Sequence, residues 1–286
     1  MMRWTTEQGG VNKLWRTPLN GDTLGLAWLG QAGFAVRFSG CRLLIDPYLS
    51  NHLADKYRGT EFPHVRMMPA PVAAEQIGEL DSVFCSHRHS DHMDPGSLAF
   101  LAKANPRARF IVPRAEMDFA ISIGIPEKRL IGVSARDVLQ LNETIEFRVL
   151  ASAHEEQKIN AHGDHHFLGF VLKSRICTLY HSGDTVVYPG LAEELAAHRI
   201  DLAMLPVNGR DEFRRSRGIA GNMNFDEAAQ LCVKANIPVL VPHHFGMFEF
   251  NTVPLPELSA VAGAMDKPRC VVPDVNHWYQ TERSRA

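Results

Sequence analysis

The sequence predicts an α/β fold in which two mixed β-sheets pack together and helices cover their outer faces. Segments with a strand pattern outnumber helical segments in each half of the chain, and the helical segments fall between them. No fixed-period repeat, low-complexity segment or linker rich in proline, glycine or serine divides the 286 residues. Because a chain of this length can form one large α/β unit, we predict a single domain over residues 1–286.

The first half of the chain opens on polar residues without periodicity, and residues 1–20 are predicted to be an N-terminal extension. Helices are predicted over 95–103, which starts with a proline favoured in a first turn, and over 115–123. Residues 49–70 show little pattern and are predicted to be a long loop. Apolar runs bounded by turn residues predict strands at 23–29, 33–38, 41–46, 82–86, 109–112 and 143–151.

The second half repeats this alternation. Helices are predicted at 225–234 and 257–265. Strands are predicted at 167–173, 176–181, 201–206, 239–242 and 270–272, the last of which is expected to close the chain.

Charge, hydropathy and cysteine usage restrict the class of protein. The chain has 30 Lys+Arg and 32 Asp+Glu, and a net charge of -2 argues against nucleic-acid binding by phosphate neutralisation. No apolar run approaches the roughly 18 residues of a membrane-spanning helix, and the N-terminus has no apolar signal core. The five cysteines stand apart without a C-x-x-C pair and are predicted to be buried free thiols. These features predict a cytoplasmic protein that binds neither nucleic acid nor a membrane.

The residues that can carry chemistry are concentrated in S-H-R-H-S-D-H-M-D over residues 86–94, directly after an apolar strand. His87 and His89 are two residues apart, so in an extended loop their side chains point the same way and can converge on one ion. Asp91 and His92 fall where the chain turns into the next helix and can face a second ion nearby. The segment therefore predicts a metal site.

The motif H-x-H-x-D-H after a strand resembles that of the metallo-β-lactamase superfamily, whose αββα four-layer sandwich carries a one- or two-metal hydrolytic site. Later landmarks follow in the superfamily's order: His154 at a strand end, Asp184 in H-S-G-D-T, and His244 in P-H-H-F-G. Near the start, W-L-G-Q-A-G over 28–33 and L-I-D-P over 44–47 resemble its opening hairpin and its structural aspartate, here Asp46. The resemblance spans roughly residues 23–250 and implies the αββα fold.

The resemblance also implies two metal ions. Their ligands would be His87, His89 and His154 for one ion, Asp91, His92 and His244 for the other, with Asp184 shared. Nitrogen and oxygen ligands without cysteine suit Zn or Mn. Two such ions about 3.5–4 Å apart can bind a hydroxide that attacks the substrate. Asp91 is the predicted catalytic residue, which orients this nucleophile and passes on a proton.

Within the superfamily, L-Y-H-S-G-D over 179–184, R-G-I over 217–219 and I-P-E-K-R over 125–129 resemble the L-ascorbate-6-phosphate lactonases. This implies a metal-dependent hydrolase acting as a lactonase on a small sugar-derived lactone, with or without a phosphate. P-H-H-F-G-M-F over 242–248 also resembles the N-acylphosphatidylethanolamine phospholipase D group, so a phosphodiesterase is an alternative. A non-catalytic metal-binding module is the second alternative, and loss of ligands would mark it. A homo-oligomer is compatible with each of these functions.

Two further histidines neighbour the predicted ligands. His181 lies three residues before Asp184, so in a strand it points to the opposite side. It is predicted to support the site from behind or to belong to the core. His243 precedes His244, and because adjacent strand residues face opposite ways, only His244 is expected to bind metal.

Two groups of residues remain as candidates for contact with substrate. A histidine-rich loop over 161–166 is either solvated or overhangs the site, and His166 is its candidate residue. A basic run is either a solvated face or an anion pocket, and it comprises Arg210, Arg214, Arg215 and Arg217. Arg217 is the best candidate, since a guanidinium binds phosphate or carboxylate in bidentate fashion.

Overall fold

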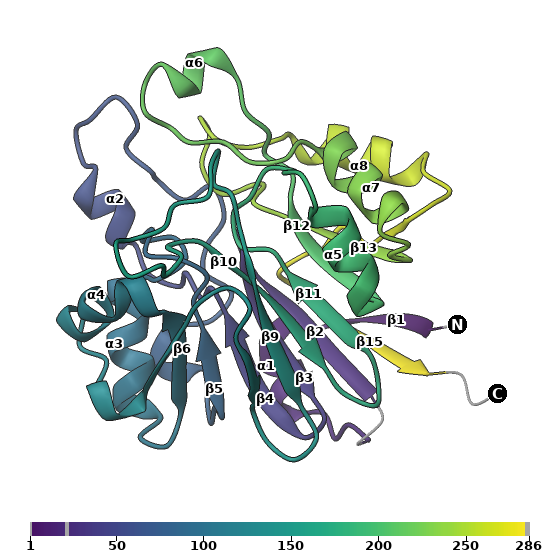
Figure 1. The fold of residues 1–286 in the computed structure, drawn as a ribbon, viewed down its shortest axis with the longest axis horizontal. Coiled ribbons are helices and arrows are strands. Elements are labelled where there is room, and N and C mark those ends of the chain that lie inside the picture. Colours follow the sequence, from purple (N-terminus) through teal and green to yellow (C-terminus); the bar gives the residue numbers. More distant parts are fainter. Residues whose placement is uncertain (1, 21–22, 284–286) are drawn as a thin grey trace.

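The computed structural model describes residues 2–20 and 23–283. It consists of two mixed β-sheets flanked by helices (Figure 1). On the first sheet, α1 (Gly10–Arg16) contacts β2 and α4 (Met117–Ser122) contacts β6, while α7 (Phe225–Lys234) contacts β12 and β13 of the second. The predicted αββα sandwich is confirmed.

Eight strands form the first sheet. Strands from β1 to β4 pair antiparallel, and those from β4 to β7 pair parallel. Their order across the sheet is β1 (Met2–Gln8), β15 (His277–Arg283), β2 (Thr23–Gly30), β3 (Gly33–Phe38), β4 (Cys41–Ile45), β5 (Ser82–Phe84), β6 (Arg109–Pro113) and β7 (Leu130–Val133).

Seven strands form the second sheet. Strands from β8 to β11 pair antiparallel, and those from β11 to β14 pair parallel. Their order is β14 (Arg269–Cys270), β13 (Val239–His243), β12 (Leu202–Pro206), β11 (Thr178–His181), β10 (Leu168–Lys173), β9 (Glu146–Ala151) and β8 (Val138–Gln140).

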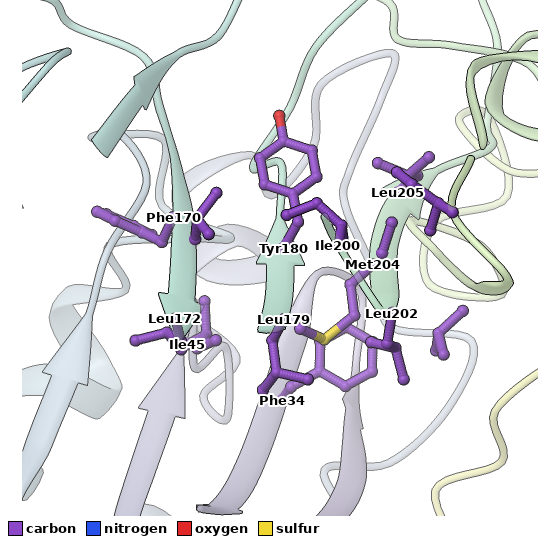
Figure 2. Packing of buried hydrophobic residues seen from close by; sticks show 14 of the residues in the cluster. Phe34, Ile45, Phe170, Leu172, Leu179, Tyr180, Ile200, Leu202, Met204 and Leu205 are labelled. Atoms are coloured by element: carbon purple, nitrogen blue, oxygen red, sulfur yellow. The ribbon is translucent and has the colours of Figure 1, made fainter. Parts of the chain in front are cut away.

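Aromatic and aliphatic side chains join the two sheets. The ring of Phe84 in the first sheet lies 5.4 Å from that of Phe147 and 5.2 Å from that of Phe170, both in the second. Figure 2 shows part of the same cluster, to which β3 contributes Phe34 and β12 contributes Met204. These residues are fully or almost fully buried, and burial of each large apolar side chain contributes roughly 1.5–3 kcal/mol.

The helices close the outer faces. The helix predicted over 225–234 is confirmed as α7, and Asn224 and Glu227 form a capping box at its start. The other longer helices are α3 (Pro95–Ala104), α5 (Leu191–His198) and α8 (Leu255–Gly263). No helix in the described part of the chain is both long and apolar enough to cross a bilayer. The cysteines are free thiols as predicted, and all except the half-buried Cys270 are buried.

The two chain ends contain elements that were not predicted. Within residues 1–20, where the sequence shows no periodicity, the chain forms β1 and α1. The strand predicted to close the chain is not the last, because β15 follows it. Strand β15 lies between β1 and β2, with Thr6 opposite Tyr279. Residues 5–8 of β1 are exposed, which explains their polar composition, and the pairing joins segments about 270 residues apart.

Several shorter elements also differ from the prediction. The predicted loop 49–70 contains α2 (His52–Lys56), and the helix predicted over 115–123 is divided into a short 3-10 turn, Arg114–Glu116, and α4. Strands β7 and β8 and helices α5 and α6 (Glu212–Arg215) were not predicted. All but α5 have only three or four residues, too few for a periodic pattern.

The topology gathers several loops at one end of the sandwich. Strands β5, β9, β11 and β13 each run toward this end, where the chain leaves them in loops. The tight turn between β2 and β3 lies there too, because Gln31 in this turn accepts a hydrogen bond from the backbone N–H of His244 after β13. The predicted ligands lie in these loops.

Candidate metal centre

The structure brings all seven predicted ligands together. The H-x-H-x-D-H motif follows β5, His154 follows β9, Asp184 follows β11 and His244 follows β13. Their ligand atoms form three groups, each within 4.8 Å: His87, His89 and His154; His87, His92 and Asp184; and Asp91, His92 and His244.

Asp184 stands between the two triads that the sequence predicted. Its Oδ1 lies 3.3 Å from His92 Nε2, and its Oδ2 lies 3.2 Å from His244 Nε2. The same Oδ2 is 3.8 Å from His154 Nε2, on the other side of the cluster. One buried carboxylate therefore reaches residues of both triads, as a bridging ligand must.

The clustered ligand residues fit divalent cations, because several of their buried polar atoms have no hydrogen-bond partner. Buried polar atoms are almost always hydrogen-bonded. Four atoms of this cluster are buried without a hydrogen bond, and they are His87 Nε2, His92 Nε2, His154 Nδ1 and Asp184 Oδ1. Neutral imidazoles and carboxylates are ligands for Zn, Mn, Fe or Co.

The electrostatics of the cluster also favour bound cations. Burial lowers the pKa of His87 well below its usual value, and burial lowers that of His89 to about 4. These imidazoles are neutral at pH 7, which metal binding requires. Burial also lowers the pKa of His92, but the carboxylates of Asp184, Asp91 and Asp46 together raise it well above the usual value. The carboxylates thus stabilise additional positive charge at this point.

Asp46 holds the motif from behind. Its Oδ1 accepts a 2.7 Å hydrogen bond from the Ser86 backbone N–H, and its Oδ2 accepts one of 2.6 Å from Ser86 Oγ. His92 Nδ1 lies 2.7 Å from the same Oδ2. When Nδ1 donates to Asp46, Nε2 of His92 is left free to bind metal, which is how carboxylates commonly orient ligand histidines.

His181 and His243 stack behind the centre, with ring centroids 5.0 Å apart and planes 5° from parallel. His181 Nε2 lies 2.8 Å from the carbonyl oxygen of Ala32, and its Nδ1 accepts a hydrogen bond from the Gly183 N–H. Both nitrogens of His181 are therefore engaged away from the ligand cluster. Among the described residues, His244 contributes to the ligand groups and His243 does not.

Three residues of the site other than glycine have positive φ angles. Gln31, Asp46 and His244 have φ of 52°, 46° and 63°, a region that L-residues other than glycine seldom occupy. Such backbone strain often occurs at functional sites. Gly183 has φ of 58°, and a Cβ there would lie 2.6 Å from Ser86 Cβ, so only glycine fits. This contact packs the loop of Asp184 against the start of the motif.

Gln31 is a functional residue that sequence analysis did not single out. It is fully buried, and its Nε2 donates to Asp91 Oδ2 at 2.8 Å. Nε2 also lies 3.1 Å from His244 Nε2. The sequence around Gln31, between Gly30 and Ala32, indicates a tight turn. It does not indicate the partners of the side chain, because these lie 60 and 213 residues further along the chain. Gln31 thus orients Asp91.

We expect Gln31→Ala to weaken metal binding about tenfold, because hydrogen-bond partners of ligands typically contribute 10- to 100-fold to metal affinity. Titration of metal-free protein with Zn or Mn measures this change. Gln140→Ala, at an exposed position on β8, is the matched control and should bind metal as the wild type does. Equal affinity in wild type and Gln31→Ala would show that Gln31 does not position Asp91.

Comparison with known families agrees with this geometry. The family model described as "Beta-lactamase superfamily domain" matches residues 41–245. The chain belongs to the β-lactamase superfamily. Among curated relatives, a UPF0173 metal-dependent hydrolase of Caldivirga maquilingensis is 27% identical over 223 residues, which is 78% of this chain and 82% of the relative. A probable L-ascorbate-6-phosphate lactonase UlaG of Escherichia coli O127:H6 is 24% identical over 251 residues, 78% of this chain and 69% of the relative.

Solved structures share the fold. The isothiocyanate hydrolase from Delia radicum gut bacteria matches this chain with a TM-score of 0.69 at 16% identity. The match covers 89% of this chain and 98% of the hydrolase. Igni18, a metallo hydrolase from Ignicoccus hospitalis, has a TM-score of 0.66 at 18% identity, covering 92% of this chain and all of its own. The family model and the curated relatives show that the chain is a metal-dependent hydrolase of the β-lactamase superfamily.

A cavity of about 550 Å³ lies at the candidate metal centre. Five of the predicted ligands line it: His89, Asp91, His154, Asp184 and His244. The apolar and aromatic part of its wall is formed by Leu53, Tyr57 and Phe248. Its positive charge comes from Lys56 and Arg88. The Arg88 side chain is 63% exposed, and its nearest carboxylate, on Glu116, is 3.8 Å away.

The two predicted substrate contacts are not among the residues that line this cavity. Arg217 is paired with Glu61, with 3.1 Å between Nε and Oε1, and its guanidinium lies 3.8 Å from the ring centroid of Phe213. His166 Nδ1 lies 2.5 Å from Glu116 Oε1. The basic run is occupied elsewhere too, because Arg210 pairs with Glu227, Arg214 with Asp211, and Arg215 with Glu155 and Glu212.

Proposed function

We propose that this chain opens a small lactone by hydrolysis, using two divalent cations, Zn or Mn, held by the seven clustered residues. The position of Asp184 between the two triads, with unpartnered ligand atoms around it, carries the proposal. When bound, two such ions lower the pKa of a water and stabilise the oxygen that leaves. Water adds across the ester C–O bond, giving a hydroxy acid.

Asp91 is the proposed catalytic residue. It lines the cavity, and its carboxylate accepts a hydrogen bond from Gln31. Burial raises its pKa, but His92 and His244 lower it, and the net effect places the pKa below its usual value. Asp91 is therefore a carboxylate at neutral pH, able to accept a proton from the attacking water and return it to the alkoxide that ring opening releases.

The cavity wall indicates the kind of lactone. The stacked rings of Tyr57 and His64, with centroids 4.2 Å apart, can pack against one face of a small ring. Arg88 and Lys56 line the same cavity and can bind a carboxylate or phosphate on the substrate. In this proposal Arg88 takes the role that the sequence suggested for Arg217.

Arg88→Ala is therefore expected to raise KM for an anionic lactone about tenfold, because a charge-assisted hydrogen bond contributes about 1.5–3 kcal/mol. KM for a neutral lactone of the same size should change little. Arg217→Ala is the control and should leave both KM values near those of the wild type. If Arg217→Ala raises KM selectively and Arg88→Ala does not, the assignment of Arg88 is wrong.

The proposed reaction can be tested by assaying a panel of lactones beside bis(p-nitrophenyl) phosphate, with metal content measured on the same sample. We expect saturable turnover of at least one lactone, lost in His154→Ala and kept in His162→Ala, a control at an exposed loop position. Turnover of the phosphodiester alone would favour the phosphodiesterase alternative. No turnover by metal-loaded protein on an extended panel would favour a non-catalytic module.

A further inference from the structure

A second cavity, of about 580 Å³, lies at the other end of the first sheet. Its residues come from β3 and the turn to β4, from the segments that lead into β5 and β6, and from residues 141–142 after β8. Asp81, which lines it, precedes β5, whereas the metal-binding motif follows β5. Four guanidinium groups line this cavity, those of Arg37, Arg42, Arg107 and Arg109.

This arginine cavity has an excess of positive charge. Within residues 2–20 and 23–283, none of the four arginines has a carboxylate within ion-pair distance, whereas eight other arginines do. Glu79 and Asp81 also line the cavity and are exposed. Asp81 Oδ2 instead accepts the backbone N–H of Arg42 at 2.8 Å. Four guanidinium groups therefore face two carboxylates.

Two of these arginines oppose each other directly. Arg37 on β3 and Arg42 on β4 are cross-strand partners in the antiparallel register. Like charges in this position destabilise a sheet. Burial and the neighbouring Arg42 lower the pKa of Arg37. An anion between them would remove this repulsion.

The protein uses only part of the donor capacity of these side chains. A guanidinium has five N–H groups. Arg37 donates through Nη1 to the carbonyls of Leu14 and Thr17, and Arg42 donates through Nη2 to that of Trp15. These bonds fix the two guanidinium groups at the end of α1, which pre-organises them, and leave their other N–H groups without a protein acceptor among the described residues.

The other two arginines are held differently. Arg109 donates through Nη2 to the carbonyl of Leu141, and Arg107 is exposed and makes no side-chain hydrogen bond with the described residues. Asn142, also in the lining, donates its amide N–H to Cys41 Sγ at 2.9 Å. The cavity thus combines three anchored guanidinium groups with one free to close on a ligand.

We propose that the arginine cavity is a binding site for a small phosphate-bearing anion, separate from the hydrolytic centre. The paired N–H groups of a guanidinium match two oxygens of a phosphate. Four guanidinium groups offer more such pairs than the two oxygens of a single carboxylate can accept, which favours a phosphate-bearing anion. A volume of about 580 Å³ is within the range of small-molecule sites. This site does not depend on the proposed lactonase activity.

Calorimetric titration of the purified protein with inorganic phosphate and with pyrophosphate, at low ionic strength, tests the site. We expect saturable binding, tighter for pyrophosphate, that is weakened about tenfold in Arg107→Gln and abolished in Arg107→Glu. Arg107 is exposed and makes no side-chain hydrogen bond or ion pair with the described residues, so both variants should keep the wild-type melting temperature and turnover.

Arg269→Gln, at an exposed arginine on β14 of the other sheet, is the matched control and should bind both anions normally. No saturable binding by the wild type would overturn the proposal. Equal affinities in wild type and the two Arg107 variants would place the anion elsewhere, including at the metal centre, and would overturn it as well. An equal loss in the control would show non-specific charge attraction, with the same consequence.

Discussion

Asp184→Asn is expected to lower kcat by about 100-fold or more and to reduce the metal content of the purified protein. The substitution keeps the shape of the side chain but removes the charge that faces His92 on one side and His244 on the other. Without that charge, two cations held close together repel each other with less compensation. Because the proposed nucleophile depends on both ions, occupancy and turnover should fall together.

Steady-state kinetics and elemental analysis of the same preparation measure both effects. Asp226→Asn, an exposed aspartate in the first turn of α7, controls for the loss of one carboxylate. Its kcat and metal content should equal those of the wild type. Near-normal turnover in Asp184→Asn would mean that this carboxylate does not bridge the two triads.

The second large effect is expected for Asp46→Ala. This change leaves the backbone N–H of Ser86, its hydroxyl and Nδ1 of His92 without their acceptor, and all of these groups are buried. Each buried polar group left unpaired costs about 1–3 kcal/mol, so the free energy of unfolding should fall by roughly 3 kcal/mol or more. Loss of the hydrogen bond that orients His92 should also weaken metal binding about 10- to 100-fold.

Denaturant unfolding of the metal-free proteins separates the stability effect from the effect on metal binding, which titration of the folded variant then measures. Asp266→Ala, at an exposed position, is the control. If Asp46→Ala has wild-type stability and metal affinity, the hydrogen bonds of Asp46 do not support the centre.

The part of the site that could be predicted from the residues alone is the part that lies within one short segment of the sequence. The motif over 86–94 lies in one loop after one strand, so its density of ligand types was visible without a structure. His154, Asp184 and His244 were placed by resemblance, and they meet because the strands before them end at the same side of the sandwich. Gln31 reaches the centre only through the β2–β3 turn, a contact that no local pattern encodes.

The substrate contacts could not be predicted from sequence. The basic run and the R-G-I resemblance predict Arg217 as a substrate contact, and the histidine-rich loop predicts His166. The structure pairs each with a glutamate far along the chain, Arg217 with Glu61 and His166 with Glu116. Which side chain is free to bind substrate depends on such contacts between residues far apart in the sequence. Similarly, pairing of β1 with β15 joins the two chain ends and could not be deduced from either segment alone.

Elemental analysis of protein purified without chelator tests the two-ion centre most directly. Seven clustered ligands with unpartnered buried atoms lead us to expect about two ions of Zn or Mn per chain, and fewer in Asp184→Asn. Absence of bound metal in the wild type, even after reconstitution with Zn or Mn, would contradict the account.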